Sequence, residues 1–371
     1  MKIAHVVAYV SADGAYGGPA RVALTQAEAL AALGHDVTVF AGAPLEEAGF
    51  RTASGYEIQT YPARLLLGRR SFAYVAAPLL LSALRRQLAH FDVVHIHLAR
   101  DLITLPAADL VRGRGVRYVL QTHGMVDASQ RRLAKLLDAL STRRVLRNSA
   151  AVLSLTEQED SDLIAVEPTA KIARVRNGVR VAPVPPLAGR EDMVLFLARL
   201  QSRKRPRAFV EMARLLKDEL PDTSFVIAGP DEGEGRAVSE EIVAAGLQDR
   251  VSWIGAIAPD RTDEYMERAR AYVLPSFGEV FPMSVLEAFR AGTPVVTTRS
   301  LGIASACDRY GAAILTDGSP EQLAQGLLSI VGNPEEAEEL RRGAARFLQS
   351  ELDVVDVANA LVSIYQGEES A

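Results

Sequence analysis

The sequence predicts an α/β protein of two domains, each built on a doubly wound parallel sheet. With 371 residues, the chain is too long for one ordinary hydrophobic core. Short runs rich in β-branched residues alternate with longer helix-like stretches, which is typical of βαβ units. The segment Val181–Gly189, rich in Pro and Ala, interrupts this alternation before it starts again. We therefore place one domain at residues 1–182 and the other at 190–352.

The first domain is expected to alternate short strands with helices. The expected strands are Ile3–Tyr9, Asp36–Phe40, Val93–His97, Tyr118–Thr122 and Ala151–Ser154. The expected helices are Pro19–Leu33, Phe72–Ala89, Arg131–Leu146 and Gln158–Ala165. The first of them begins with proline, at the position where a helix tolerates it best.

The second domain repeats the pattern. Its expected strands are Met193–Leu197, Phe225–Ala228, Val251–Ile254, Tyr272–Leu274, Val295–Thr297 and Ala313–Leu315. Its expected helices are Pro206–Leu216, Val238–Ala245, Pro282–Ala291 and Glu321–Ile330. Because ligands bind at the carboxyl ends of parallel strands, we expect the site in a cleft between two facing sheets.

Composition excludes several classes of protein. Lys and Arg number 41 against 46 Asp and Glu, and the net charge of −5 does not favour nucleic acid as a partner. The single cysteine, Cys307, cannot form an internal disulfide, so we expect a reducing, cytoplasmic location. The apolar stretch Phe72–Ala83 is interrupted by Pro78 and is shorter than the ~20 residues of a membrane-spanning helix.

The stretch Pro275–Pro294 (PSFGEVFPMSVLEAFRAGTP) is expected to join a strand to a helix that Pro282 opens. The free N–H groups of the first helical turn, at Met283 and Ser284, favour a bound phosphate. The spacing alone leaves two interpretations open for the carboxylates that flank this turn. Glu279 and Glu287 either bind sugar hydroxyls and a ribose diol, or they are an exposed loop acid and a complement to the helix dipole.

A second loop is strongly basic. Leu195–Pro206 ends an expected strand and carries four cations, Arg199, Arg203, Lys204 and Arg205. Guanidinium and ammonium groups together hold a diphosphate well and stabilise it as a leaving group. Taken alone, the stretch is equally compatible with a solvated basic loop.

Together these motifs closely resemble the donor site of glycosyltransferase family 4, whose fold of two Rossmann-like domains is called GT-B. The matching pattern is E-x7-E, with Phe281 and Pro282 between the two glutamates, combined with Arg-x4-Lys. The resemblance continues through further short motifs along nearly the whole chain. They are Tyr16–Pro19, Asp92–His97 (DVVHIH), Gln121–Gly124 (QTHG), Arg176–Val179 (RNGV), Ile227–Gly233 (IAGPDEG) and a terminal helix near Val354–Tyr365. In this fold the last helix, here about 353–371, crosses back onto the first domain.

The resemblance implies a role for each matching residue. Arg199 and Lys204 would grip the donor diphosphate, Glu287 the ribose, and Glu279 and His123 the transferred sugar. The remaining positions would line the nucleotide-sugar site. They are Phe281, Pro282, Met283, Ser284, Gly17, Gly18 and Gly229.

Each N-terminal motif also has a purely structural interpretation. His123 is followed by glycine at the end of a strand, a good place for a ligand, although a lone histidine is more often structural. Gly17 and Gly18 let backbone amides approach a ligand, or they form a plain turn. They do not form G-x-G-x-x-G, which argues against a nicotinamide enzyme.

No metal or other cofactor is expected. His95 and His97 form an H-x-H pair that can bind a metal, but without nearby Cys or clustered carboxylates a packed strand end is favoured. No D-x-D occurs where a metal-dependent transferase would place it. The diphosphate would then be neutralised by the two basic side chains and the helix end.

Residues 129–147 combine several cations with leucines at helical spacing. This segment is predicted to be either a solvated helix face or a surface for an anionic membrane or an anionic acceptor. In the membrane case, the protein would sit peripherally at the inner face of the membrane.

Two positions depart from the family pattern. Arg180 replaces an acidic residue after RNGV, which puts the local structure there in question. Leu301–Ser305 (LGIAS) replaces a Gly-Gly-x-x-Glu element, which removes one expected contact near the donor.

The sequence therefore predicts a metal-independent, retaining glycosyltransferase. It would move a hexose-type sugar from a nucleotide diphosphate sugar, UDP in preference to GDP, to a hydroxyl of a saccharide, a lipid-linked saccharide or a small molecule. The alternatives are a nucleotide-sugar epimerase of the same fold and a non-catalytic nucleotide-sugar binding module. The sugar and the acceptor are left open, because acceptor recognition depends on variable loops.

Overall fold

The computed structural model describes residues 1–11, 17–65 and 74–368. It divides into two compact units, Met1–Arg180 with Leu352–Ala371, and Val181–Glu351. No helix among these residues has the length and hydropathy needed to cross a membrane.

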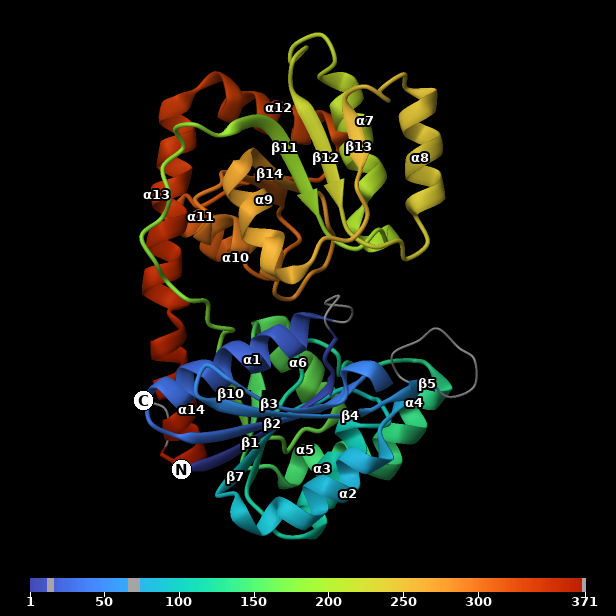
Figure 1. Ribbon diagram of the computed structural model, residues 1–371, viewed down its shortest axis with the longest axis vertical. Coiled ribbons are helices and arrows are strands. Elements are labelled where there is room, and N and C mark those ends of the chain that lie inside the picture. The colour runs from blue at the N-terminus through green and yellow to red at the C-terminus, as the bar shows by residue number, and fades with distance from the viewer. Residues whose placement is uncertain (12–16, 66–73, 369–371) are drawn as a thin grey trace. The chain divides into compact units, whose positions relative to one another are not determined.

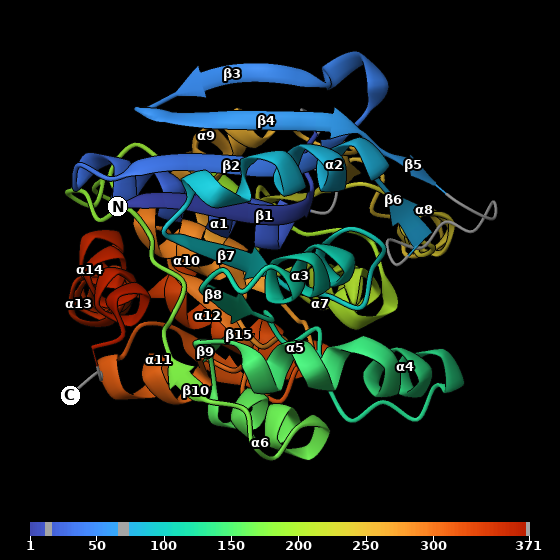
Figure 2. The same cartoon turned by 90° about the horizontal axis from the view of Figure 1, so that it is seen from below.

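The first unit contains an eight-stranded sheet in the order β10-β9-β8-β7-β1-β2-β4-β3 (Figure 2). The strands are β1 (Lys2–Tyr9), β2 (Asp36–Ala43), β3 (Gly49–Ala53), β4 (Tyr56–Pro62), β7 (Val93–His97), β8 (Tyr118–Gln121), β9 (Ala151–Ser154) and β10 (Ile172–Arg174). All neighbours pair in parallel except β3 and β4, which are antiparallel. A separate two-stranded ribbon joins β5 (Arg64–Leu65) to β6 (Val75–Ala76).

Helices cover both faces of this sheet (Figure 1). They are α1 (Gly17–Ala32), α2 (Pro78–Gln87), α3 (Thr104–Gly113), α4 (Arg132–Leu137), α5 (Arg143–Asn148), α6 (Glu157–Val166) and α14 (Val354–Gln366). Because strand side chains alternate between faces, Ile3 and Val7 of β1 join one core with α1 and α14. Ala4 and Val6 join the other core, with α2, α3 and α5.

The second unit contains a fully parallel six-stranded sheet in the order β13-β12-β11-β14-β15-β16. Its strands are β11 (Glu191–Leu197), β12 (Ser224–Ala228), β13 (Val251–Trp253), β14 (Ala269–Leu274), β15 (Val295–Thr298) and β16 (Ile314–Thr316). Its helices are α7 (Pro206–Leu215), α8 (Gly235–Ala244), α9 (Thr262–Arg268), α10 (Met283–Arg290), α11 (Ala304–Tyr310), α12 (Pro320–Gly332) and α13 (Pro334–Glu351). The predicted fold class, an α/β chain with two Rossmann-like sheets, is thus confirmed.

Some expected elements were wrong or incomplete. The first two residues of the helix expected at Phe72–Ala89 lie outside the described residues. In the rest of this range Val75–Ala76 is a strand and the helix begins at Pro78, because a residue that precedes proline avoids the helical conformation. The helix expected at Arg131–Leu146 contains a π-helical turn at Asp138–Thr142. Asp138 turns inward there and binds Arg100, with 2.8 Å between Oδ1 and Nε. Strands β3, β4, β5, β6 and β10 and helices α3, α9, α11 and α13 were not expected.

Candidate active site

The basic loop after β11 and the loop after β14 meet in the second unit. Lys204, at the end of a short 3-10 turn, donates a hydrogen bond from Nζ to Oε1 of Glu279. Both side chains are nearly buried, with exposed fractions of 12% and 8%. Burial lowers the pKa of Lys204, and the neighbouring Glu279 only partly offsets this. Burial acts to raise the pKa of Glu279, but Lys204 reverses the effect and leaves that pKa below its ordinary value.

Arg199 lies on the same loop but has a different carboxylate partner. Its guanidinium donates to Oε1 of Glu232 at 2.7 Å, and the side chain is 40% exposed. Its charge is close enough to lower the pKa of Lys204 further. The two cations therefore lie near each other, and each has its own carboxylate.

Helix α10 begins beside the same loop. Pro282 precedes it, and no side chain caps its first turn. The hydroxyl of Tyr272 lies 2.8 Å from Oγ of Ser284 and 3.1 Å from the carbonyl oxygen of Leu197. Buried Tyr272 thus holds the start of α10 against the end of β11, from which the Arg199 loop departs. The first N–H groups of a helix have no partners within the helix, so they are available to an anion.

The other residues predicted around α10 differ in burial. Glu287 is 7% exposed and already engaged in a contact, so it is not a solvated complement to the helix dipole. Pro282 is buried, whereas Phe281, Met283 and Ser284 are half-buried.

Gly229 has a backbone that only glycine adopts without strain, with φ of +148°. A Cβ at this position would lie 2.0 Å from the carbonyl oxygen of Ala198 and 3.2 Å from the backbone nitrogen of Arg199. Leu200 N–H also donates to the Pro230 carbonyl at 2.8 Å. The close approach that glycine permits therefore fixes the path of the loop that carries Arg199.

In the first unit, His123 follows β8 and has a positive φ of 52°, a conformation that is uncommon outside glycine. The loop is held by the buried carboxylate of Glu159 in α6. This group accepts hydrogen bonds from Thr122 Oγ1 at 2.5 Å, Gly124 N–H at 2.6 Å and Leu155 N–H at 2.8 Å. Backbone strain held by surrounding contacts is typical of functional sites.

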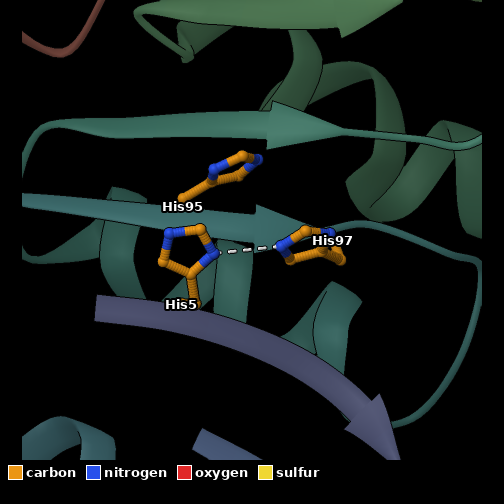
Figure 3. A group of neighbouring side chains, drawn as sticks. All are labelled: His5, His95 and His97. Atoms are coloured by element: carbon orange, nitrogen blue, oxygen red, sulfur yellow. Dashed lines mark hydrogen bonds between the residues drawn. The ribbon is translucent and has the colours of Figure 1, made fainter. Parts of the chain in front are cut away.

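The imidazole of His123 belongs to a group of four histidines. Its Nε2 lies 2.8 Å from Nδ1 of His97, and Nε2 of His97 lies 3.1 Å from Nδ1 of His5. Figure 3 shows His5 beside His95 and His97 on the neighbouring strand. Nδ1 of His95 instead lies 2.6 Å from the hydroxyl of Tyr365 in α14.

This cluster bears on the H-x-H pair. The ligand nitrogens of His5, His95 and His97 lie within 4.8 Å of one another. However, the rings of His95 and His97 stack with an interplanar angle of 11°. Imidazole nitrogens bind a metal in the plane of the ring, so the nitrogens of two stacked rings run side by side and do not converge on one ion. The present arrangement fits a hydrogen-bonded core better than a metal site.

The glycine-rich loop is described only in part. Tyr16 lies outside the described residues, and Gly17 and Gly18 form the first turn of α1. Gly18 is exposed, and a Cβ built there meets nothing within 4 Å. Packing therefore does not require glycine at this position.

The two departures from the family pattern also have local partners. Arg180 pairs with Glu28 of α1, with 2.6 Å between the guanidinium and Oε1. The N–H of Gly302 donates to the carbonyl oxygen of Glu279 at 2.7 Å, so the LGIAS segment supports the Glu279 loop through its backbone.

Sequence reasoning missed three residues of these sites: Glu159, Glu232 and His5. Glu159 lies within the acidic run EQED and looks like part of a solvated surface. His5 is separated from its partner His97 by 92 positions in the chain. Once β1 and β7 are predicted as neighbours, histidines in both strands are the only sequence signal for that contact.

Both halves of the chain match known protein families. The family "Glycosyl transferase 4-like domain" matches residues 17–178, and "Glycosyl transferases group 1" matches residues 182–347. A 2-deoxystreptamine N-acetyl-D-glucosaminyltransferase from Niallia circulans is 35% identical over 40% of this chain and 38% of its own length. A D-inositol 3-phosphate glycosyltransferase from Rhodococcus jostii is 26% identical over 71% of this chain and 63% of its own length.

A solved structure extends the match to the whole fold. HepE from Anabaena, in complex with UDP and glucose, superposes with a TM-score of 0.76 at 16% identity and covers 99% of both chains. Its GT-B architecture is that of the two sheets described above. The two families together match most of the chain, which therefore belongs to the family 4-like glycosyltransferases.

Proposed function

We propose that this glycosyltransferase moves a hexose-type sugar from a UDP-sugar, with retention and without a metal, to a hydroxyl of a saccharide, a lipid-linked saccharide or a small molecule. The observation that carries the proposal is the site in the second unit, where Lys204, Arg199 and the first turn of α10 lie together. Among its relatives are an N-acetyl-D-glucosaminyltransferase and a D-inositol 3-phosphate glycosyltransferase, and the HepE structure contains UDP. The UDP in HepE favours UDP over GDP.

The charges at this site suit a departing diphosphate. An ammonium has three N–H donors and a guanidinium five, and the contacts with Glu279 and Glu232 each use one of them. The remaining donors, with the N–H groups of α10, are directed at developing negative charge that water screens poorly near a buried side chain. Glu279 holds the nearly buried ammonium in place before the donor binds.

The proposed reaction needs no dedicated base. The bond from C1 of the sugar to the diphosphate oxygen breaks, and its electron pair stays on that oxygen. The acceptor oxygen forms its bond to C1 on the same face, and its proton passes to the departing phosphate oxygen. We propose that Glu287 binds the ribose, that Glu279 and His123 contact the sugar, and that Phe281, Met283, Gly17 and Gly18 line the site.

The first experiment is a donor screen. Purified protein is incubated with a panel of UDP- and GDP-sugars, with and without acceptors, and release of nucleotide diphosphate is measured. We expect a UDP-sugar to give release of UDP. We also expect NMR to show that the product has the same anomeric configuration as the donor sugar. A product with the opposite anomeric configuration would refute retention. Loss of activity when EDTA is added would refute metal independence.

Variants test the proposed residues. Lys204→Ala is expected to lower kcat by about 10²–10³-fold, as for other lost contacts to developing charge. Arg203→Ala removes the same charge from an exposed position of the same loop and is the matched control. Unchanged release by Glu279→Ala would remove Glu279 from the site.

We further propose that the face at 129–147 contacts an anionic membrane. Three leucines of this face, Leu133, Leu136 and Leu140, are 47%, 54% and 58% exposed. They lie beside exposed cations, and two cations of the same segment, Lys135 and Arg143, line part of a hollow of 390 Å³. Apolar and basic groups on one helical surface suit the boundary between head groups and acyl chains.

Vesicle sedimentation tests this contact. We expect binding to vesicles that contain anionic lipid, weaker binding to neutral ones, and loss of binding in Leu136→Asp. Val243→Asp, which changes an equally exposed apolar residue of α8, is the control. Equal sedimentation of Leu136→Asp and the unmodified protein would refute the contact.

A further inference from the structure

Three of the four clustered histidines form a continuous hydrogen-bonded row. His5 lies in β1, His97 ends β7, and His123 follows β8, so the row crosses three adjacent strands of the sheet. The contacts are His5 Nδ1 to His97 Nε2 and His97 Nδ1 to His123 Nε2. His5 and His97 are buried, with exposed fractions of 0% and 1%, and only His123 reaches partial exposure.

The rings in this row are neutral. Burial lowers the pKa of His5 and of His123 to about 3 and holds the pKa of His97 well below its ordinary value. A neutral imidazole has one N–H donor and one bare nitrogen acceptor. The row can therefore be ordered in only two ways, with every ring donating toward His123 or every ring donating toward His5.

The far end of the row distinguishes these two orders. Nε2 of His5 is buried and has no hydrogen-bond partner among the described residues. If the rings donated toward His5, this nitrogen would carry a buried N–H without an acceptor, which is rare and costly in folded proteins. If they donate toward His123, the same nitrogen holds only a bare lone pair. The second order is the more stable one.

We propose that the row fixes His123 as the tautomer with its proton on Nδ1, and that His97 and His5 are positioning residues for it. Nε2 of His123 then accepts from His97 Nδ1, and Nδ1 of His123 is an N–H donor. This inference rests on the proposed function in one respect, namely that the ligand of His123 is a sugar. An N–H hydrogen-bond donor suits an oxygen-rich ligand such as a sugar. Because Nδ1 already carries a proton, it does not act as a base toward the acceptor hydroxyl.

Direct observation of the tautomer is the primary test. The chain has six histidines, and 15N labelling of histidine resolves protonated from bare ring nitrogens by NMR. The His123 signals are identified by their loss in His123→Gln. We expect a protonated Nδ1 and a bare Nε2 in the unmodified protein at neutral pH. A protonated Nε2 overturns the proposal, whatever the enzyme does.

Two substitutions of His97 separate positioning from packing. An asparagine amide occupies the place of the histidine Nδ1, so His97→Asn keeps a hydrogen-bond donor for His123. A glutamine amide occupies the place of Nε2, so His97→Gln keeps only the contact with His5. We expect His97→Asn to retain the His123 tautomer and most of kcat/KM. We expect His97→Gln to give a mixture of tautomers and to lower kcat/KM by about tenfold. The reverse ranking would overturn the proposal.

His95 provides the matched control. It lies on the same strand as His97 and is equally buried, but it bonds to Tyr365. His95→Gln should leave the His123 tautomer unchanged, and a change there would show that general repacking of the cluster sets the tautomer. If no nucleotide-sugar is turned over, the proposed function fails but the tautomer found by NMR is unaffected. Failure of the proposed function and failure of the tautomer proposal are therefore distinguishable.

Discussion

The carboxylate of Glu159 should stabilise the first unit more than any exposed acid of the same helix. It is 1% exposed and accepts three hydrogen bonds, two of them from the loop that carries His123. Hydrogen bonds to a charged group contribute about 1.5–3 kcal/mol each, and neighbouring contributions do not add fully. We therefore expect Glu159→Ala to lower the free energy of unfolding of this unit by about 4 kcal/mol.

Glu159→Gln should have an intermediate effect. Its amide oxygen can still accept from Thr122 and Gly124, but its NH2 group would face the N–H of Leu155. One bond is lost, and we expect a decrease of about 2 kcal/mol in the free energy of unfolding. Because both variants loosen the strained His123 loop, turnover should fall in the same order.

Urea unfolding followed by two probes measures these changes. The only tryptophan, Trp253, lies in the second unit and reports on that unit, whereas circular dichroism reports on both. With a slope of about 2 kcal/mol per molar urea, Glu159→Ala should shift the first unit's midpoint by about 2 M. Glu157→Ala is the control, because the Glu157 side chain is 88% exposed and forms an exposed ion pair with Arg174. Equal midpoints for the two alanine variants would refute the reasoning.

Three further predictions concern backbone space and proton uptake. Gly229→Ala should destabilise the second unit by several kcal/mol because its Cβ has no room, whereas Gly246→Ala, at φ of +64° in open space, should cost about 1 kcal/mol. Unfolding of both variants is followed by the fluorescence of Trp253, which donates a hydrogen bond to the Gly229 carbonyl. Equal losses of stability would contradict the clash. Gly18→Ala should leave the melting temperature unchanged but lower turnover if a ligand approaches that backbone; normal turnover would remove Gly18 from the site. The pKa of His5 is 6.5 in the unfolded chain and about 3 in the folded one, so the unfolded chain takes up this proton first and stability is lost as pH falls below 6.5. His5→Gln should reduce that loss by about 1.4 kcal/mol per pH unit. If urea unfolding gave the same dependence of stability on pH for both proteins, His5 would not be buried in its neutral form.

Strands with strong apolar patterns could be predicted from the sequence almost to the residue. Val93–His97 and Ala151–Ser154 match β7 and β9 because all their side chains are buried. Strand β3 was missed because it is an edge strand whose residues are mostly exposed, so it has no apolar signal. Helix α13 was missed although its apolar positions are periodic, since its first turns are strongly acidic.

The candidate site could be predicted as a set of residues but not as a set of contacts. Each motif identifies a loop, and the topology then brings the loops of β11 and β14 to adjacent strand ends. That Lys204 binds Glu279 while Arg199 binds Glu232 depends on loop paths that Gly229 and Tyr272 determine. Sequence patterns do not encode those paths.

Carboxylates offset the cations of the candidate site and position them as well. The side chains of Arg199 and Lys204 add two positive charges, and those of Glu232 and Glu279 remove two. These four charges sum to zero, and Arg203 of the same loop, whose charge acts on both Lys204 and Glu279, adds a further positive charge. Selection of a diphosphate therefore depends on geometry as well as on charge, namely on N–H donors that the carboxylates leave unused and on the amides at the start of α10. On this reasoning Glu279 and Glu232 aim the cations before the donor binds, as Glu159 and the histidine row aim His123.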